Sequence, residues 1–118
     1  RPRPAASPPP QARTLRMAAI ELVPEVAGDF ERIRAHLALH EAHDPDGHIR
    51  DIIEAFDVLE RNPRIGRPVR AGKRELIIGR RGHGYIALYR YIEALDTVFI
   101  LAIRSQREAG YRSPSLDQ

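Results

Sequence analysis

Apolar residues recur at helical spacing through the first half of the chain. The positions that share this spacing are Val26, Phe30, Ile33 and Leu37. Their intervals of four, three and four residues place them on one face of a helix. We expect this helix to begin near Pro24, because proline suits a first helical turn, and to run to about His43.

A second amphipathic stripe follows after a short DPDG connection. Asp44 supplies a capping side chain, and Pro45 suits the first turn behind it. The apolar positions of this stripe are Ile49, Ile52, Ile53, Phe56 and Leu59. The helix should end at Asn62 and Pro63, since proline has no amide proton to donate. Two striped helices joined by so short a link predict an antiparallel helical hairpin with an acidic outer face.

The apolar pattern then changes from a helical period to short runs typical of β-strands. These runs are RELIIG at 74–79, GYIALYRYI at 84–92 and TVFILAI at 97–103. A further strand, MAAIELV at 17–23, precedes the first helix and is stopped by Pro24. TVFILAI is apolar on both faces, as expected of a central strand covered by helices on one side and partly on the other.

The order of these elements predicts an α+β fold, β-α-α-β-β-β, with the helical hairpin packed on one face of a curved antiparallel sheet. A chain of 118 residues suits one such domain. We assign residues 17–112 to it. Residues 1–16 are predicted to be a disordered tail rich in proline and arginine, either an extension or a misassigned start before Met17, and residues 113–118 a flexible C-terminus.

Composition excludes some classes of site and location. The chain holds no cysteine, so disulfides and thiolate metal sites are excluded. No apolar run approaches the length of a membrane span, and no signal-peptide pattern opens the chain. We therefore expect a cytoplasmic protein without a membrane partner.

Charge is divided unequally between two parts of the chain. Residues 21–60 hold eleven acids and three bases, whereas residues 61–90 hold nine bases and one acid. Arg64, Arg67 and Arg70 recur every three residues in the loop before the sheet. This asymmetry either offers a basic surface to an acidic partner or lets the two parts of one molecule attract each other.

Several segments together resemble the RelE/ParE superfamily, the toxins of bacterial type II toxin–antitoxin systems. The segments are VPEVAGDFERI, LERNPRIGRPV, RELIIG, GYIALYRY and the terminal VFILAIRSQREAGY. The resemblance covers about residues 17–111 and implies the same fold, a growth-inhibiting toxin and a role in plasmid stabilisation. It also implies a cognate antitoxin, whose disordered and often acidic segment would fold along the basic loop and sheet of the toxin. We expect no cofactor.

RelE-like members of this superfamily cut messenger RNA on the ribosome, which requires a base, an acid and cations beside the phosphate. The resemblance places catalytic cations where this chain has Leu76, Ile77, Ile78, Gly79 and Ile86. Tyr111 does align with a nuclease tyrosine, and Arg104 falls near a basic position. If the chain is a nuclease, the candidate catalytic residues are His83, Arg104, Glu108 and Tyr111, with Glu75 as a further candidate base.

ParE-like members instead poison DNA gyrase by protein contact, and the cation-poor strands with the ending RSQREAGY favour this branch. The predicted target-binding or antitoxin-binding residues are Arg80, Arg81, Arg104, Arg107 and Tyr111. Arginine and tyrosine commonly anchor interfaces, although Arg80 and Arg81 are equally expected as solvated turn residues. We favour a non-enzymatic gyrase inhibitor, with ribosome-dependent mRNA cleavage as the alternative. We expect no direct DNA binding by the toxin alone, because neither helix leaves a basic recognition face.

Two other groups of residues do not predict a site. The histidines that gather on and after the first helix are His36, His40, His43 and His48. Exposed histidines on the flank of an apolar stripe are more often solvated than metal-bound, so we predict no metal site. Ser105 has no histidine or lysine spaced to activate it as a nucleophile.

Overall fold

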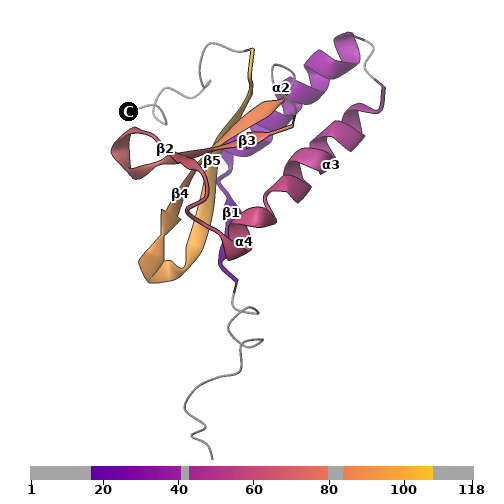
Figure 1. The fold of residues 1–118 in the computed structure, drawn as a ribbon. Coiled ribbons are helices and arrows are strands. Elements are labelled where there is room, and N and C mark those ends of the chain that lie inside the picture. The colour runs from indigo at the N-terminus through magenta and orange to yellow at the C-terminus, as the bar shows by residue number, and fades with distance from the viewer. Residues whose placement is uncertain (1–16, 41–42, 80–83, 108–118) are drawn as a thin grey trace, which may run out of the picture.

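The computed structural model describes residues 17–40, 43–79 and 84–107 of the chain (Figure 1). Its strands are Ala19–Leu22 (β1), Arg67–Pro68 (β2), Arg74–Ile78 (β3), Tyr85–Ile92 (β4) and Thr97–Ser105 (β5). Its helices are Glu25–Leu39 (α2), Pro45–Ala55 (α3) and Val58–Arg61 (α4), with short 3-10 turns at Arg70–Gly72 and Glu93–Leu95. The predicted order of helices and strands is confirmed, and β2 is an additional strand inside the basic loop. The predicted tails at 1–16 and 113–118 lie outside the described residues.

The strands form one sheet in the order β1-β5-β4-β3-β2. The ladders from β2 to β5 are antiparallel, as the predicted antiparallel sheet requires. The β1–β5 ladder is parallel, a pairing that the sequence pattern did not predict. The cause is the helical crossover between β1 and β3, which returns the chain to the end of the sheet where β1 began. Strands β1, β3 and β5 therefore run in the same direction.

The helices form the predicted hairpin and lie on one face of the sheet (Figure 1). Asp44 caps α3 by accepting the N–H of Gly47 at 3.1 Å. Across the hairpin, Arg34 Nε lies 2.8 Å from Asp46 Oδ1. No helix within the described ranges has the length and apolar character needed to cross a membrane.

The second predicted helix is divided in two by a tightened turn at Phe56 and Asp57. The Phe56 N–H donates to Ile53 C=O at 3.1 Å, and the Leu59 N–H donates to Phe56 C=O at 2.9 Å. These bonds span three residues rather than four, which is 3-10 geometry. The turn keeps both Phe56 and Leu59 in the core, where they are 2% and 0% exposed. The apolar stripe therefore continues through the break.

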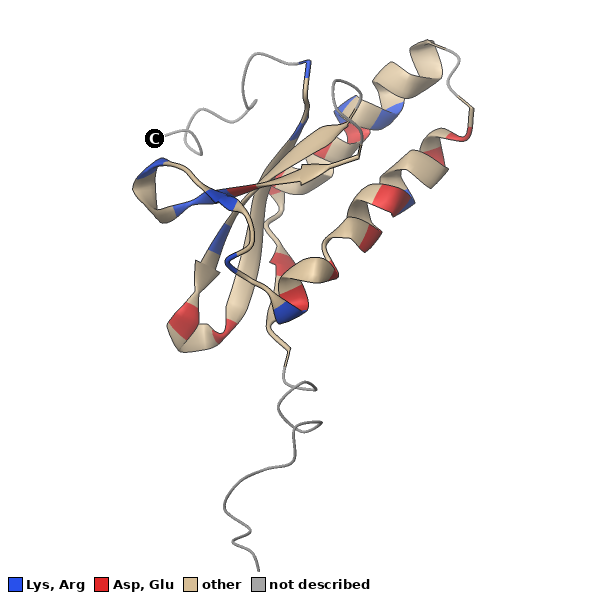
Figure 2. Ribbon diagram, viewed as in Figure 1, with Lys and Arg blue, Asp and Glu red and all other residues tan. Residues whose placement is uncertain are grey.

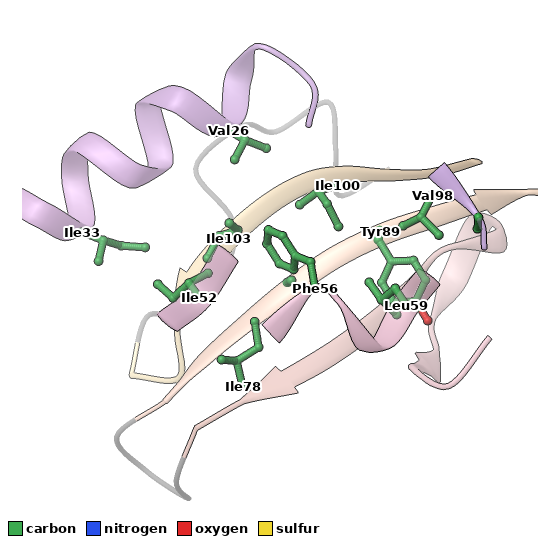
Figure 3. Close-up of a cluster of buried hydrophobic side chains, with 12 residues drawn as sticks. Val26, Ile33, Ile52, Phe56, Leu59, Ile78, Tyr89, Val98, Ile100 and Ile103 are labelled. Atoms are coloured by element: carbon green, nitrogen blue, oxygen red, sulfur yellow. The ribbon is translucent and has the colours of Figure 1, made fainter. Parts of the chain in front are cut away.

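The hydrophobic core lies between the helices and the sheet (Figure 3). Its largest fully buried side chains are Tyr89, Ile52, Leu59, Ile100, Ile103, Val26 and Val98. On the opposite face of the sheet, Ile86, Leu88 and Ala102 are also buried. The central strands β4 and β5 are thus buried on both faces, as the apolar run at 97–103 predicted.

A buried ionic cluster attaches α2 to β5. The Asp29 carboxylate accepts the N–H of Ile103 at Oδ2, at 2.9 Å, and pairs with Arg32 Nη1 at Oδ1, at 2.8 Å. Arg32 Nη2 also donates to the carbonyl of Ile103 at 3.1 Å. The two side chains therefore satisfy both backbone groups of Ile103 beyond the end of β1, which pairs with β5 only as far as Ile100.

Candidate functional site

Cations gather on the β2–β3 hairpin and on the strand beside it (Figure 2). We call this surface the basic hairpin, and its members are Arg64, Arg67, Arg70, Arg74 and Arg90. The acids lie mainly on α2, α3 and α4 and at the turn between β4 and β5 (Figure 2). The charge asymmetry of the sequence is therefore also an asymmetry of the folded surface.

Two arginines of the basic hairpin pair with acids of strand β3 and of the turn between β4 and β5. Arg67 Nη2 lies 2.5 Å from Glu75 Oε1, directly across the β2–β3 ladder. Arg64 Nη2 lies 3.2 Å from Glu93 Oε1, and its guanidinium carbon stacks 4.9 Å from the centre of the Tyr91 ring. In these two ion pairs, Arg64 and Arg67 therefore do not contact the acidic helices of the same chain, although one interpretation of the sequence predicts that they do.

Two further cations hold the hairpin through backbone carbonyls. Arg74 Nη1 donates to the carbonyls of Arg64 and Gly66, at 3.0 Å and 2.9 Å. Arg90 Nη2 donates to the carbonyl of Ala71 at 2.8 Å, and Ala71 has a left-handed φ of 63°. The guanidinium groups thus fix the shape of the surface on which they lie.

Glu75 is poorly placed to act as a general base. It is 8% exposed and its carboxylate is in contact with Arg67. A base must reach the proton that it removes, and it must be able to accept that proton. A carboxylate that is buried against an arginine is poorly accessible to a substrate proton, so this geometry weighs against the suggested catalytic role of Glu75.

Arg104 lies on β5, in a row that is otherwise apolar. Its cross-strand neighbour is Ile86 on β4, and the neighbour of Ile86 on β3 is Ile77. Arg104 Nη1 donates to the Ser105 carbonyl at 3.3 Å. The side chain of Arg104 is partly buried, so its guanidinium is held against the sheet rather than extended into solvent.

Arg107 follows β5 in a turn, where it is exposed. Its N–H donates to Ser105 Oγ at 3.1 Å, so Ser105 serves as a turn acceptor. The other predicted site residues lie outside the described residues: Arg80, Arg81, His83, Glu108 and Tyr111. Besides Glu75, the structure therefore positions two predicted site residues, Arg104 near the end of β5 and Arg107 just beyond it.

The phenols of the sheet are held in their protonated form. Burial raises the pKa of Tyr89, whose Oη accepts the N–H of Gly66 at 2.8 Å. A hydrogen bond donated to Asp96 at 2.7 Å raises the pKa of Tyr91. Neither tyrosine ionises near neutral pH, so both act as structural anchors of the basic hairpin.

His36 lies on α2, and His40 is the capping residue after its C-terminal end. His40 Nδ1 lies 3.0 Å from the carbonyl of His36, and the two rings are 4.2 Å apart. Within the described parts of the chain, no group of three or more His, Cys, Asp or Glu residues is arranged to hold a metal ion.

Comparisons with known proteins identify the family of this fold. A family model for the ParE toxin of the type II toxin–antitoxin system parDE matches residues 20–110. The chromosomal ParDE system from P. aeruginosa aligns with a TM-score of 0.63 and 24% identity, over 76% of this chain and 97% of that chain. The RelBE2 toxin–antitoxin complex from Mycobacterium tuberculosis aligns with a TM-score of 0.52 and 24% identity, over 80% and 97%. No curated protein matches the sequence. Because the family model spans most of the chain, the protein belongs to the ParE toxin family of type II toxin–antitoxin systems.

Proposed function

We propose that this toxin inhibits growth by binding DNA gyrase through a protein interface, and that a cognate antitoxin neutralises it by covering that interface. Membership of the ParE family supports the first part of the proposal. The solved relatives are toxin–antitoxin systems, which supports the second part. The protein is then a cytoplasmic inhibitor rather than an enzyme.

The observation that carries this proposal is the row Ile77, Ile86 and Arg104 across the sheet. Cleavage of RNA by its own 2′-hydroxyl needs a group that accepts a proton, and a guanidinium does not serve because it stays protonated. The cross-strand neighbour of Arg104 in this row is Ile86, and the next residue of the row, Ile77, is also an isoleucine. An arginine beside apolar side chains has the character of an interface anchor, because arginine is enriched among residues that dominate binding energy.

The basic hairpin supports an acidic protein partner. Its guanidinium groups are preorganised by carbonyl contacts and ion pairs, so little side-chain entropy remains to be lost on binding. An acidic antitoxin segment that folds on contact would gain charge-assisted hydrogen bonds there. The same surface is then exposed to the target when the antitoxin is degraded.

Replacing Arg104 by alanine tests the role of the row. We expect Arg104→Ala to weaken target binding by about 2 kcal/mol, roughly 30-fold, because the guanidinium would anchor the interface. Inducible expression of the full chain in bacteria should cause filamentation with DNA damage, and the variant should relieve it. Arg34→Ala on the exposed helical hairpin is the matched control and should remain toxic.

The variant proteins must be compared by melting temperature, so that loss of toxicity is separated from unfolding. Full toxicity of a folded Arg104→Ala variant would remove Arg104 from the interface. Arrest of translation with cleaved messages and undamaged DNA would contradict gyrase as the target.

A further inference from the structure

Strand β5 is longer than its parallel partner β1. The ladder between the two strands ends at Leu22 and Ile100. Pro24 stops β1 just beyond this point, because proline has no amide proton to donate. The last residues of β5, up to Ser105, therefore extend past the strand that would otherwise bind the backbone groups along their edge.

Two side chains of α2 bind this edge where β1 no longer reaches it. The Asp29 carboxylate accepts the N–H of Ile103 at 2.9 Å, and Arg32 Nη2 donates to the Ile103 carbonyl at 3.1 Å. Asp29 and Arg32 are three positions apart, so they share one face of the helix, and they pair with each other at 2.8 Å. The buried ionic cluster thus binds the same two backbone groups that a neighbouring strand would bind.

The ionic cluster acts on the residue directly before Arg104. Backbone groups alternate in direction along a strand. Because those of Ile103 point toward α2, those of Arg104 point toward β4, where its partner is Ile86. The N–H of Gln106 continues this pairing by donating to the carbonyl of Gly84 at 3.0 Å. The backbone around Arg104 is therefore held from both sides, by α2 and by β4.

Asp29 itself is not placed to touch a partner that binds Arg104. It is 7% exposed and lies on the face of the sheet that the helices cover. Ile103 belongs to the core on that face, whereas Arg104 is the next residue of β5 and its side chain lies on the opposite face. Any effect of Asp29 on a partner at Arg104 must therefore pass through the backbone of β5.

A buried ion pair is by itself weak evidence for a contribution to stability. The cost of removing two charges from water offsets much of their attraction, and apolar side chains of similar volume often serve as well. Apolar side chains could not, however, bind the N–H and C=O of Ile103. Loss of one member is costly in either case, since it leaves the other charge buried. A fall in stability alone therefore does not separate a positioning role from a structural one.

We propose that Asp29 is a positioning residue for target binding. Through the N–H of Ile103 it fixes the segment of β5 that carries Arg104, so that the guanidinium meets the target in one preorganised position. An anchor that is already ordered loses less conformational entropy on binding, so a loosened β5 should bind more weakly. This inference rests on the proposed function for the identity of the target, while the positioning geometry rests on the bonds to Ile103.

A double-mutant cycle tests this proposal. The affinity for purified DNA gyrase is measured for the parent chain, for Asp29→Asn, for Arg104→Ala and for the double variant. Asparagine keeps the size of Asp29 and one acceptor oxygen, but it loses the charge that pairs with Arg32. Asp29→Asn should weaken binding by about fivefold in the parent chain. In the Arg104→Ala background it should have no further effect, because no anchor remains to be positioned.

A graded series and a control on the same helix complete the experiment. Asp29→Ala removes both acceptor oxygens and should weaken binding more than Asp29→Asn, by about 20-fold, again only when Arg104 is present. Glu31→Ala replaces an exposed acid of α2 and should leave the affinity unchanged. All affinities are measured well below the lowest unfolding midpoint of the series. The milder Asp29→Asn variant carries the cycle if Asp29→Ala does not fold.

The outcomes separate this proposal from the proposed function. Equal losses of affinity with and without Arg104 would make Asp29 a purely structural residue, and would overturn the positioning role while gyrase remains the target. Unchanged affinity of a folded Asp29 variant would overturn it in the same way. Absence of gyrase binding by the folded parent chain would instead overturn the proposed function, and the positioning role with it.

Discussion

Gly66→Ala is expected to lower the free energy of unfolding by about 3 kcal/mol, because a methyl group has no space at this position. A Cβ added to Gly66 would lie 2.6 Å from Tyr89 Cε1 and 2.8 Å from the backbone oxygen of Glu75. The phenol of Tyr89 is buried and accepts the Gly66 N–H. Any movement that relieves the contact breaks that bond or displaces strand β3, which carries Glu75.

Chemical denaturation of the parent chain and of the Gly66→Ala variant, under the same conditions, measures this loss. Gly28→Ala is the matched control, since nothing lies within 4 Å of a Cβ at Gly28 inside helix α2. Alanine should stabilise that helix by up to about 1 kcal/mol. Equal effects of the two substitutions would contradict the close packing described for Gly66.

Asp29→Ala is expected to lower the free energy of unfolding by about 3 kcal/mol. The substitution leaves the Ile103 N–H and the Arg32 guanidinium without their shared acceptor. Asp29 is 7% exposed, so water does not replace the carboxylate freely. The loss should also loosen β5 near Arg104. A fall in the unfolding midpoint, with faster exchange of the Ile103 amide, checks this prediction.

Glu31 lies two positions after Asp29 on α2. Its replacement, Glu31→Ala, is the control for Asp29→Ala. Glu31 is exposed, so its replacement should change stability by no more than about 0.5 kcal/mol. If the Asp29 and Glu31 variants were equally stable, the buried cluster would have no structural role.

The spacing of apolar residues predicted the helices and strands of this fold, because that spacing marks the buried face of each element. Val26, Ile33 and Ile52 are buried where the helical stripes placed them. Periodicity carries no information on which strands are neighbours, and so it did not predict the parallel β1–β5 ladder. Strand β2 was missed because two residues are too few to show alternation.

The site was less predictable than the fold, because ion pairs depend on strand register. Arg67 and Glu75 are eight positions apart and meet only because β2 and β3 pair in one register. The sequence placed Glu75 among possible bases and Arg67 among contacts of a partner or of the helices, and it offered no sign that the two residues bind each other. The role of Asp29 as the acceptor of a β5 amide was also missed, since a single acid on a helix resembles any solvated residue.

The central claim is that this ParE family toxin acts on gyrase rather than on messenger RNA. The most direct measurement incubates the purified chain with DNA gyrase and relaxed plasmid, and in parallel with translating ribosomes. We predict loss of supercoiling or trapped cleaved plasmid, reversed by the antitoxin, with intact transcripts on the ribosomes. Unaffected supercoiling together with cleaved transcripts would contradict the account.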